Sequence, residues 1–209
     1  MNYDPRDRAG PFGQLLRDLR RCKESRKCPS LRIRSYYFEP NPETADDWRN
    51  QGFYQGEIDS RIVFVCESPG SSGGEIRSPD IKRCWAESWR DKRFQNVLLN
   101  YQLQNCYIAN TVKCGVRQGG RHSDSEIDAC IEFLVRELEL IQPMIAVGVG
   151  GNAFHTLRTR VSPRLKVPPV LFQITHYSAR RNVRELWDQE FSGLLRLRSR
   201  LQPRSKWKI

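Results

Sequence analysis

The chain has 209 residues, which is long enough for one sizeable domain with a buried core. Its 35 Lys and Arg against 24 Asp and Glu give a formal net charge of +11, so we expect an anionic partner, nucleic acid first. A membrane partner is disfavoured, because there is neither a run of roughly 18 apolar residues nor a basic amphipathic helix with an exposed apolar face. The first residues lack the charged-then-apolar order of a signal peptide, so we expect an intracellular, cytoplasmic protein. In that compartment the seven cysteines favour metal binding, a catalytic thiol or burial over disulfides.

Short apolar segments rich in β-branched residues predict four buried strands. They are 61–66, 106–110, 144–149 and 170–174. Helical patterns separate or follow them, at 13–22, at 124–141 and from Asn182 onward. Strands that alternate with helices are typical of βαβ units, so we expect an α/β fold: a single domain with a central four-stranded, mostly parallel sheet flanked by helices. Composition divides the chain into an N-terminal helix with loops at 1–60, the main domain at 61–201 and a basic tail at 202–209.

Two of the predicted helices carry capping signals. Ser123 and Glu126 form a capping box ahead of 124–141, and Pro143 lies just beyond the end of that helix. The last helix has Glu185 three residues after Asn182. Four of its residues are expected to be buried: Leu186, Trp187, Phe191 and Leu194.

Polar residues follow three of the predicted strands at the edge where parallel sheets bind ligands. Glu67 and Ser68 come after the first strand, Asn110 ends the second and His176 follows the fourth. A carboxamide carries a donor and an acceptor that suit the edge of a pyrimidine, and a histidine can polarise a leaving group. The alternatives are an ordinary βα turn at Glu67 and a turn-capping role for Asn110.

The other two histidines point less clearly to a function. His122 lies in a basic loop and His155 inside a predicted helix, so both are expected to be structural or solvated. The segment Gly148–Ala153 matches a loose dinucleotide-binding pattern, G-x-G-x-x-A, after a strand. That pattern also requires an acidic residue about 20 positions later, and 153–182 contains none. A nicotinamide cofactor is therefore excluded.

Four cysteines are candidates for metal binding. Cys22 and Cys28 flank the end of the first helix, Cys114 follows the second strand, and Cys130 lies on the capped helix. Four thiolates can hold an iron–sulfur cluster or a zinc ion. The other three cysteines are expected to be single buried thiols: Cys66, Cys84 and Cys106. Basic and aromatic residues interleave within 82–94, which suits either base stacking beside phosphates or a solvated helix face.

Over 61–182 these motifs resemble the uracil-DNA glycosylase superfamily, and within it the iron–sulfur type best known from thermophiles. In that family the motif GE-[AS]-P-G follows the first strand, and this chain has Cys66-Glu67-Ser68-Pro69-Gly70 there. The family's N-x-x-K-C segment reads Asn110-Thr111-Val112-Lys113-Cys114, and the next cysteine lies sixteen residues on, at Cys130. The second catalytic motif, usually H-P-[SA], reads His176-Tyr177-Ser178.

The resemblance implies that a damaged nucleotide is flipped out and its N-glycosidic bond is hydrolysed. Asn110 would read the base edge, and His176 would stabilise charge that grows on the uracil O2. Either Glu67 or Glu75 would orient the water, with Ser68 beside them in the catalytic group. The implied [4Fe–4S] cluster would be bound by four thiolates, with zinc as the less favoured occupant. Its ligands would be Cys114 and Cys130 from the family motif, and Cys22 and Cys28 by position.

The resemblance also implies contacts with the base and the strand. Trp89 or Trp85 would stack on the base beside Gly70. Arg180 would fill the vacated stack as a wedge. The remaining DNA contacts would come from Arg181 and Ser178.

Three positions depart from the family pattern. Cys66 stands where glycine is usual, Tyr177 where proline is usual, and Ser68 where the strongest uracil glycosylases place a water-activating Asp. The sequence predicts a monofunctional DNA glycosylase that removes uracil or a related deaminated base, leaves an abasic site and acts on DNA as a monomer. The alternatives are a changed lesion specificity, such as hypoxanthine or xanthine, and a nucleic-acid-binding module without catalysis.

Overall fold

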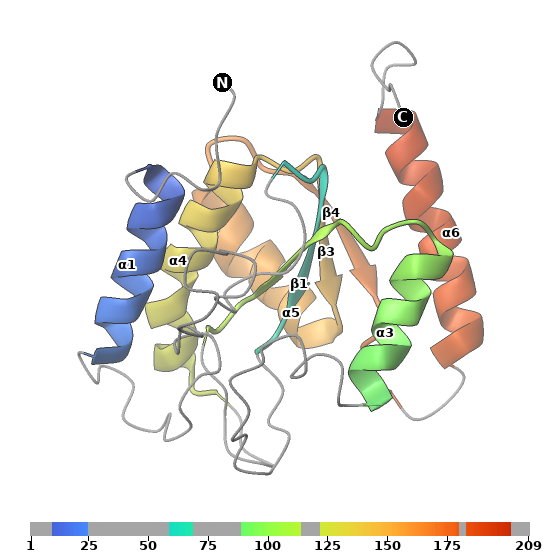
Figure 1. Ribbon diagram of the computed structural model, residues 1–209, viewed down its shortest axis with the longest axis horizontal. Coiled ribbons are helices and arrows are strands. Elements are labelled where there is room, and N and C mark those ends of the chain that lie inside the picture. The colour runs from blue at the N-terminus through green and yellow to red at the C-terminus, as the bar shows by residue number, and fades with distance from the viewer. Residues whose placement is uncertain (1–9, 25–58, 69–88, 114–121, 180–182, 202–209) are drawn as a thin grey trace, which may run out of the picture.

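The computed structural model describes residues 10–24, 59–68, 89–113, 122–179 and 183–201. Helices and strands alternate through these residues (Figure 1). In chain order they are α1 (Pro11–Glu24), β1 (Ile62–Cys66), α3 (Trp89–Asn100), β2 (Tyr107–Asn110), α4 (Asp124–Ile141), β3 (Ile145–Val149), α5 (Gly151–Thr156), the π-helical turn η2 (Leu157–Val161), the short 3-10 turn η3 (Ser162–Arg164), β4 (Val170–Ile174) and α6 (Val183–Leu201).

The four strands form one parallel sheet in the order β2-β1-β3-β4, which confirms the predicted α/β fold. The first three strands begin one residue later than predicted, and β4 has the predicted bounds. Every residue of β1, β2 and β3 is buried, as continuous apolar runs require in a sheet covered on both faces. The edge strand β4 is buried only at Ile174. Cys66 is buried, as predicted, whereas Cys106, which directly precedes β2, is half-buried, so its predicted burial is wrong.

Helices cover the sheet in two layers (Figure 1). One layer holds α1, α4 and α5, and the other holds α3 and α6. Alternate strand residues supply the two cores: Val63 and Val65 of β1 face the first layer, and Ile62 and Phe64 face the second. Within the described helices, none combines the length and the apolar composition that crossing a membrane requires.

The start of α4 is fixed by its sequence. The Ser123 hydroxyl accepts a hydrogen bond from the Glu126 amide, and the Glu126 carboxylate accepts one from the Ser123 amide, so the predicted capping box is confirmed. The helix ends at Gln142, whose φ of 50° is left-handed and whose amide donates to the Leu138 carbonyl. Pro143 follows and cannot continue the helix.

Helix α6 presents a narrower apolar face than predicted. Trp187, Phe191 and Leu194 are buried, at steps of four and three residues. Leu186 is 42% exposed, so its predicted burial is wrong. It directly precedes Trp187 and therefore lies about 100° away from it around the helix axis. Asn182, the predicted start of this helix, lies outside the described residues, as does the tail at 202–209.

Helix α1 belongs to the core of the sheet domain. Phe12, Leu15 and Leu19 recur at helical spacing and are at most 2% exposed. They pack in the same cluster as α4 and one face of the sheet. The described part of the predicted 1–60 segment therefore buries its apolar face against the main domain.

Candidate active site

The candidate site lies where the parallel strands end, at the lower edge of the sheet in Figure 1. From β1 the chain passes through α3 to β2 on one side, while β3 lies on the other side of β1. The gap between the carboxyl ends of β1 and β3 is thus a topological switch point, where open α/β sheets bind ligands. Glu67 follows β1 and Asn152 follows β3, so both lie at this point.

Glu67 is held in place by contacts from both neighbouring strands. The Asn152 carboxamide donates to the Glu67 carboxylate, with its nitrogen 3.2 Å from each oxygen. On the β2 side, the Val112 amide donates to the Glu67 carbonyl at 2.9 Å, and the Thr111 hydroxyl donates to the same carbonyl at 2.6 Å. Glu67 therefore bridges β2 and β3, and a plain βα turn does not account for its side-chain contact. Sequence reasoning missed Asn152, because its partner is distant in the chain.

Asn110 lies beside Glu67 at the end of β2. It pairs in register with Cys66, and it is only 3% exposed. The Thr111 amide donates to the Cys66 carbonyl at 2.8 Å, which extends the ladder past Asn110. The backbone of Asn110 is thus held at the strand end next to Cys66, which Glu67 and Ser68 follow in the chain; Ser68 is half-buried.

The backbone before His176 is fixed by α6. The Thr175 amide and hydroxyl both donate to the Glu190 carboxylate, at 2.8 and 2.7 Å. The Trp187 indole donates to the Thr175 carbonyl at 2.8 Å. All polar groups of Thr175 are therefore partnered by one helix, which orients the residue that follows.

His176 also depends on a glycine across the switch point. Gly150 has a φ of 91°, in the region that favours glycine, and its amide donates to the Ile174 carbonyl. A Cβ at this position would lie 3.0 Å from the Cβ of His176. Gly148, two residues earlier in β3, lets α5 approach the strand, because a Cβ there would lie 2.5 Å from the Cα of Phe154. Two glycines of the rejected dinucleotide pattern thus have packing roles.

The imidazole of His176 is held at Nδ1 by Ser178. The Ser178 amide donates to Nδ1 at 3.1 Å, and the Ser178 hydroxyl lies 2.7 Å from the same nitrogen. Acceptance of the backbone amide at Nδ1 favours the tautomer with the ring proton on Nε2. The ring also stacks on Tyr177 with centroids 4.2 Å apart, and Tyr177 stacks on Phe94 of α3 at 5.3 Å. Tyr177, where proline is usual, thus supports the histidine from below. Ser178 contacts the histidine, and its predicted contact with DNA stays a prediction.

A second histidine, His122, lies close to this edge. Both of its ring nitrogens are buried, so of the two expected alternatives, structural or solvated, burial fits the structural one. Burial lowers the pKa of the His122 imidazole below its ordinary value, against the carboxylates of Glu126 and Glu67, which favour the charged ring. His122 directly precedes Ser123, the cap of α4.

A family model described as the uracil DNA glycosylase superfamily matches residues 53–196 of this chain. The chain belongs to the uracil DNA glycosylase superfamily. The match covers every strand of the sheet and the residues placed at the switch point, and so confirms the resemblance seen in the motifs.

Individual relatives match a shorter part of the chain. A type-4 uracil-DNA glycosylase of Thermotoga maritima is 30% identical over 99 residues, which is 47% of this chain and 50% of the relative. One from Archaeoglobus fulgidus is 31% identical over 100 residues, 47% of each chain. One from Saccharolobus solfataricus is 24% identical over 112 residues, 54% of this chain and 50% of the relative. The chain therefore spans about half the length of the curated relatives it matches.

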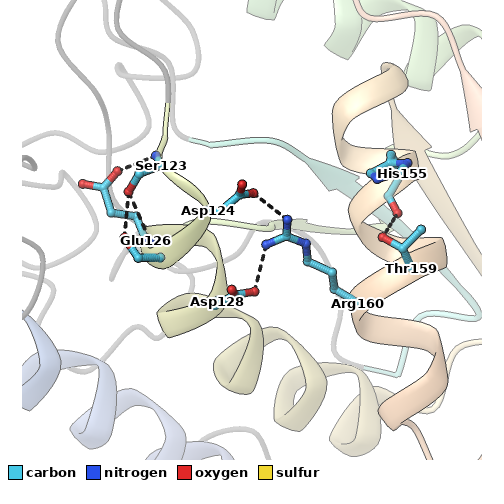
Figure 2. Close-up of polar contacts among 8 residues, drawn as sticks. Ser123, Asp124, Glu126, Asp128, His155, Thr159 and Arg160 are labelled. Carbon is cyan, nitrogen blue, oxygen red and sulfur yellow. Dashed lines mark hydrogen bonds and ion pairs between the residues drawn. The ribbon is translucent and has the colours of Figure 1, made fainter.

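His155 differs from the other two histidines of this superfamily member. It lies in α5, as predicted, and its side chain is exposed. Figure 2 shows its carbonyl accepting a hydrogen bond from the Thr159 hydroxyl at 2.8 Å. In the same view Arg160 reaches α4, donating to Asp124 at 2.5 Å and to Asp128 at 2.8 Å. These contacts fasten the segment after α5 to α4, as expected of structural residues.

Two of the four candidate cluster cysteines lie at one end of the α1–α4 pair. The helices run antiparallel (Figure 1), and Arg136 of α4 donates to Asp18 of α1 at 2.8 Å. Cys22 lies four residues after Asp18 and Cys130 six residues before Arg136. At about 1.5 Å per residue, the two cysteines are displaced by roughly 6 and 9 Å toward the same helix ends. Within the described residues no group of three or more His, Cys, Asp or Glu is arranged to hold a metal ion.

The remaining predicted site residues are not described by the structure. Trp89 is the first residue of α3, and only its backbone is described. The others lie outside the described residues: Gly70, Glu75, Trp85, Cys28, Cys114, Arg180 and Arg181. Cys114 directly follows Lys113, which is buried and paired with Glu137 of α4. The chain therefore enters the Cys114 segment from a point fixed on α4.

Proposed function

We propose that this protein is a DNA glycosylase that excises uracil, or a related deaminated base, and leaves an abasic site. The observation that carries the proposal is the contact of the Ser178 amide with Nδ1 of His176, which favours the tautomer that bears its proton on Nε2. A neutral imidazole with its N–H at the ends of the strands suits an oxyanion that forms in the transition state. Membership of the superfamily and the type-4 relatives support the same activity.

In the proposed reaction, a nucleotide is flipped out of the strand into the switch point. Asn110, buried and fixed at the end of β2, would recognise the base edge with its carboxamide. The bond between C1′ and the base nitrogen breaks, and its electron pair leaves with the base. The Nε2–H of His176 would donate to the carbonyl oxygen that gains this charge. A donor of this kind contributes about 2.7–4 kcal/mol to lowering the barrier.

Water completes the proposed reaction by adding to C1′. Glu67 would orient this water, because its carboxylate is held at the switch point by Asn152. The resemblance leaves Glu75 as a second candidate, and Ser68 is a neighbouring polar group. Water loses one proton as it adds, and the departing base gains one, so the reaction is balanced as a hydrolysis. The proposed reaction has no lyase step, because no lysine stands out in the sequence as a Schiff-base nucleophile.

Contacts with the flipped base and the strand form the next part of the proposal. Trp89 or Trp85 would stack on the base beside Gly70. Arg180 would fill the vacated stack. Arg181 and Ser178 would contact the DNA backbone, in a protein of net charge +11 that acts as a monomer.

We also propose that four thiolates hold a [4Fe–4S] cluster, with zinc as the less favoured occupant. The ligands would be Cys22, Cys28, Cys114 and Cys130. Cys22 and Cys130 fit this group, because α1 and α4 bring them to the same end of the helix pair. When bound, such a cluster would join α1, the segment after β2 and α4, which is a structural role.

The test is excision from labelled single- and double-stranded oligonucleotides that carry one uracil, followed by alkali to cleave abasic sites. Wild type should cut, His176→Ala should lose most of the activity, and His155→Ala, at an exposed site, should behave as wild type. Absence of cutting with DNA still bound would refute the glycosylase and leave a binding module. Hypoxanthine and xanthine should be tested in parallel, because Tyr177 stands where proline is usual and its ring stacks on His176.

A further inference from the structure

Three buried polar atoms at the start of α4 have no hydrogen-bond partner. They are Nδ1 and Nε2 of His122 and Oε1 of Glu126. Within the described residues, these are the buried side-chain nitrogen and oxygen atoms that lack a hydrogen-bond partner. Buried polar groups are hydrogen-bonded in the great majority of cases, so three orphans in one place require an occupant or a function. Glu126 is 6% exposed, and its other oxygen is already used by the Ser123 amide.

His122 lies near the candidate site. Two carboxylates act on the His122 ring: Glu126, from the first turn of α4, and Glu67, from the exit of β1. In Figure 1 the first turn of α4 and the carboxyl end of β1 lie at the same edge of the molecule. The His122 ring thus lies near enough to both carboxylates to be influenced by their charges, and among the described residues no cation acts on it.

The chemistry of this group suits ordered water. A neutral imidazole offers one donor and one acceptor, and the Glu126 oxygen offers a further acceptor. A buried water typically makes about three hydrogen bonds to such atoms. Water held here would also experience the negative charge of Glu67, which acts on the His122 ring.

We propose that His122 and Glu126 hold an ordered water beside Glu67, and that His122 is a positioning residue that receives, through Glu67, the proton of the hydrolytic water. This inference rests on the proposed glycosylase function and gives His122 a role in the step in which water adds to C1′. Sequence motifs gave no role to His122, and Glu67 is the residue through which it acts.

The proposed step balances. As the bond from C1′ to the base breaks with its electron pair on the base, the oxygen of water bonds to C1′. The water proton passes to the Glu67 carboxylate and through the ordered water to the neutral ring of His122, which later loses it to solvent. The step requires His122 to be neutral beforehand, and burial favours that state. A protonated His122 would accept nothing and would pair electrostatically with Glu67.

The first test measures the electrostatic coupling between His122 and Glu67 without an activity assay. Protein labelled with 15N-histidine has three imidazoles to titrate by NMR, assigned with His122→Gln and His155→Gln. We expect the His122 signal to titrate below the ordinary range, and Glu67→Gln to lower its pKa further, because a negative charge that favours the cation is removed. An unchanged His122 titration in Glu67→Gln overturns the inference.

The second test is the single-turnover excision rate between pH 4.5 and 8.5. We expect His122→Gln to stay folded and to be about tenfold to a hundredfold slower at neutral pH, the range for loss of correct positioning. The rate of His122→Gln should also not decline in acid as the wild-type rate does. The matched His155→Gln should keep the wild-type rate at neutral pH and its decline in acid. An unchanged rate and acid limb in His122→Gln overturns the positioning role. If wild type excises no base while the NMR coupling is present, the proposed function fails, and with it the hydrolytic role, but the His122–Glu67 pair stands.

Discussion

A buried ion pair links the end of β2 to α4, and its disruption should be costly. The Lys113 ammonium and the Glu137 carboxylate are in direct contact, with side chains 4% and 3% exposed. The Tyr107 hydroxyl donates to the other oxygen of Glu137 at 2.5 Å. Glu137→Gln keeps an acceptor for Tyr107 but leaves the ammonium uncompensated. Removing one partner of a buried pair costs about 3–5 kcal/mol of unfolding free energy.

The same helix offers a matched control. Glu132 pairs with Arg164 at 2.5 Å, but these side chains are 56% and 47% exposed. Since exposed pairs contribute about 0–1 kcal/mol, Glu132→Gln should change stability little. At about 2–4 °C per kcal/mol for a chain of this size, Glu137→Gln should lower Tm by roughly 6–20 °C.

The assay is urea unfolding followed by circular dichroism, with Tm from thermal scans. The double variant Lys113→Met, Glu137→Gln removes both charges while Tyr107 keeps an acceptor, so it should be more stable than Glu137→Gln alone. A loss below about 1 kcal/mol in Glu137→Gln, or a double variant less stable than the single, would refute the reasoning that an unpaired buried charge dominates.

Three further predictions concern the site. Gly150→Ala should cost about 1–3 kcal/mol of stability, because its φ of 91° strains any side chain, and it should slow excision by displacing His176; wild-type melting and rate would contradict this. Glu190→Gln removes a charged acceptor from Thr175, so we expect a loss of about 1–3 kcal/mol in urea titrations, and no loss would mean that Trp187 alone fixes that loop. Burial lowers the pKa of His122 in the folded state, so its stabilising effect is complete above the unfolded pKa and is lost as pH falls through the folded one; unfolding free energy should decline with acid below about pH 6.5, less steeply in His122→Gln, and equal slopes would refute it.

Much of the fold follows from local patterns in the sequence. The strands were predicted to within one residue, because parallel strands buried on both faces have continuous apolar runs. Helix α4 was predicted with its cap, because a capping box is a contact between residues three apart. The predicted burial of Leu186 was wrong, since helical periodicity alone does not fix the width of the buried face.

The site was only partly predictable, for a physical reason. Glu67, Asn110 and His176 stand out because each follows a strand, and strand ends are visible in the sequence. Asn152 and His122 were not predicted as site residues, because they interact with Glu67, which lies 85 and 55 residues away in the chain. The contacts of Thr175 with α6 are likewise tertiary, and no local pattern signals them.

The stack of His176 on Tyr177 and of Tyr177 on Phe94 has an evolutionary consequence. It joins the loop after β4 to α3, the helix that leads from β1 to β2. A substitution on α3 can therefore tilt the His176 imidazole without altering any residue at the strand ends. In the proposed glycosylase, base preference would then respond to such remote changes as well as to the residues around the base. Sequence surveys restricted to the two strand-end motifs would overlook that route.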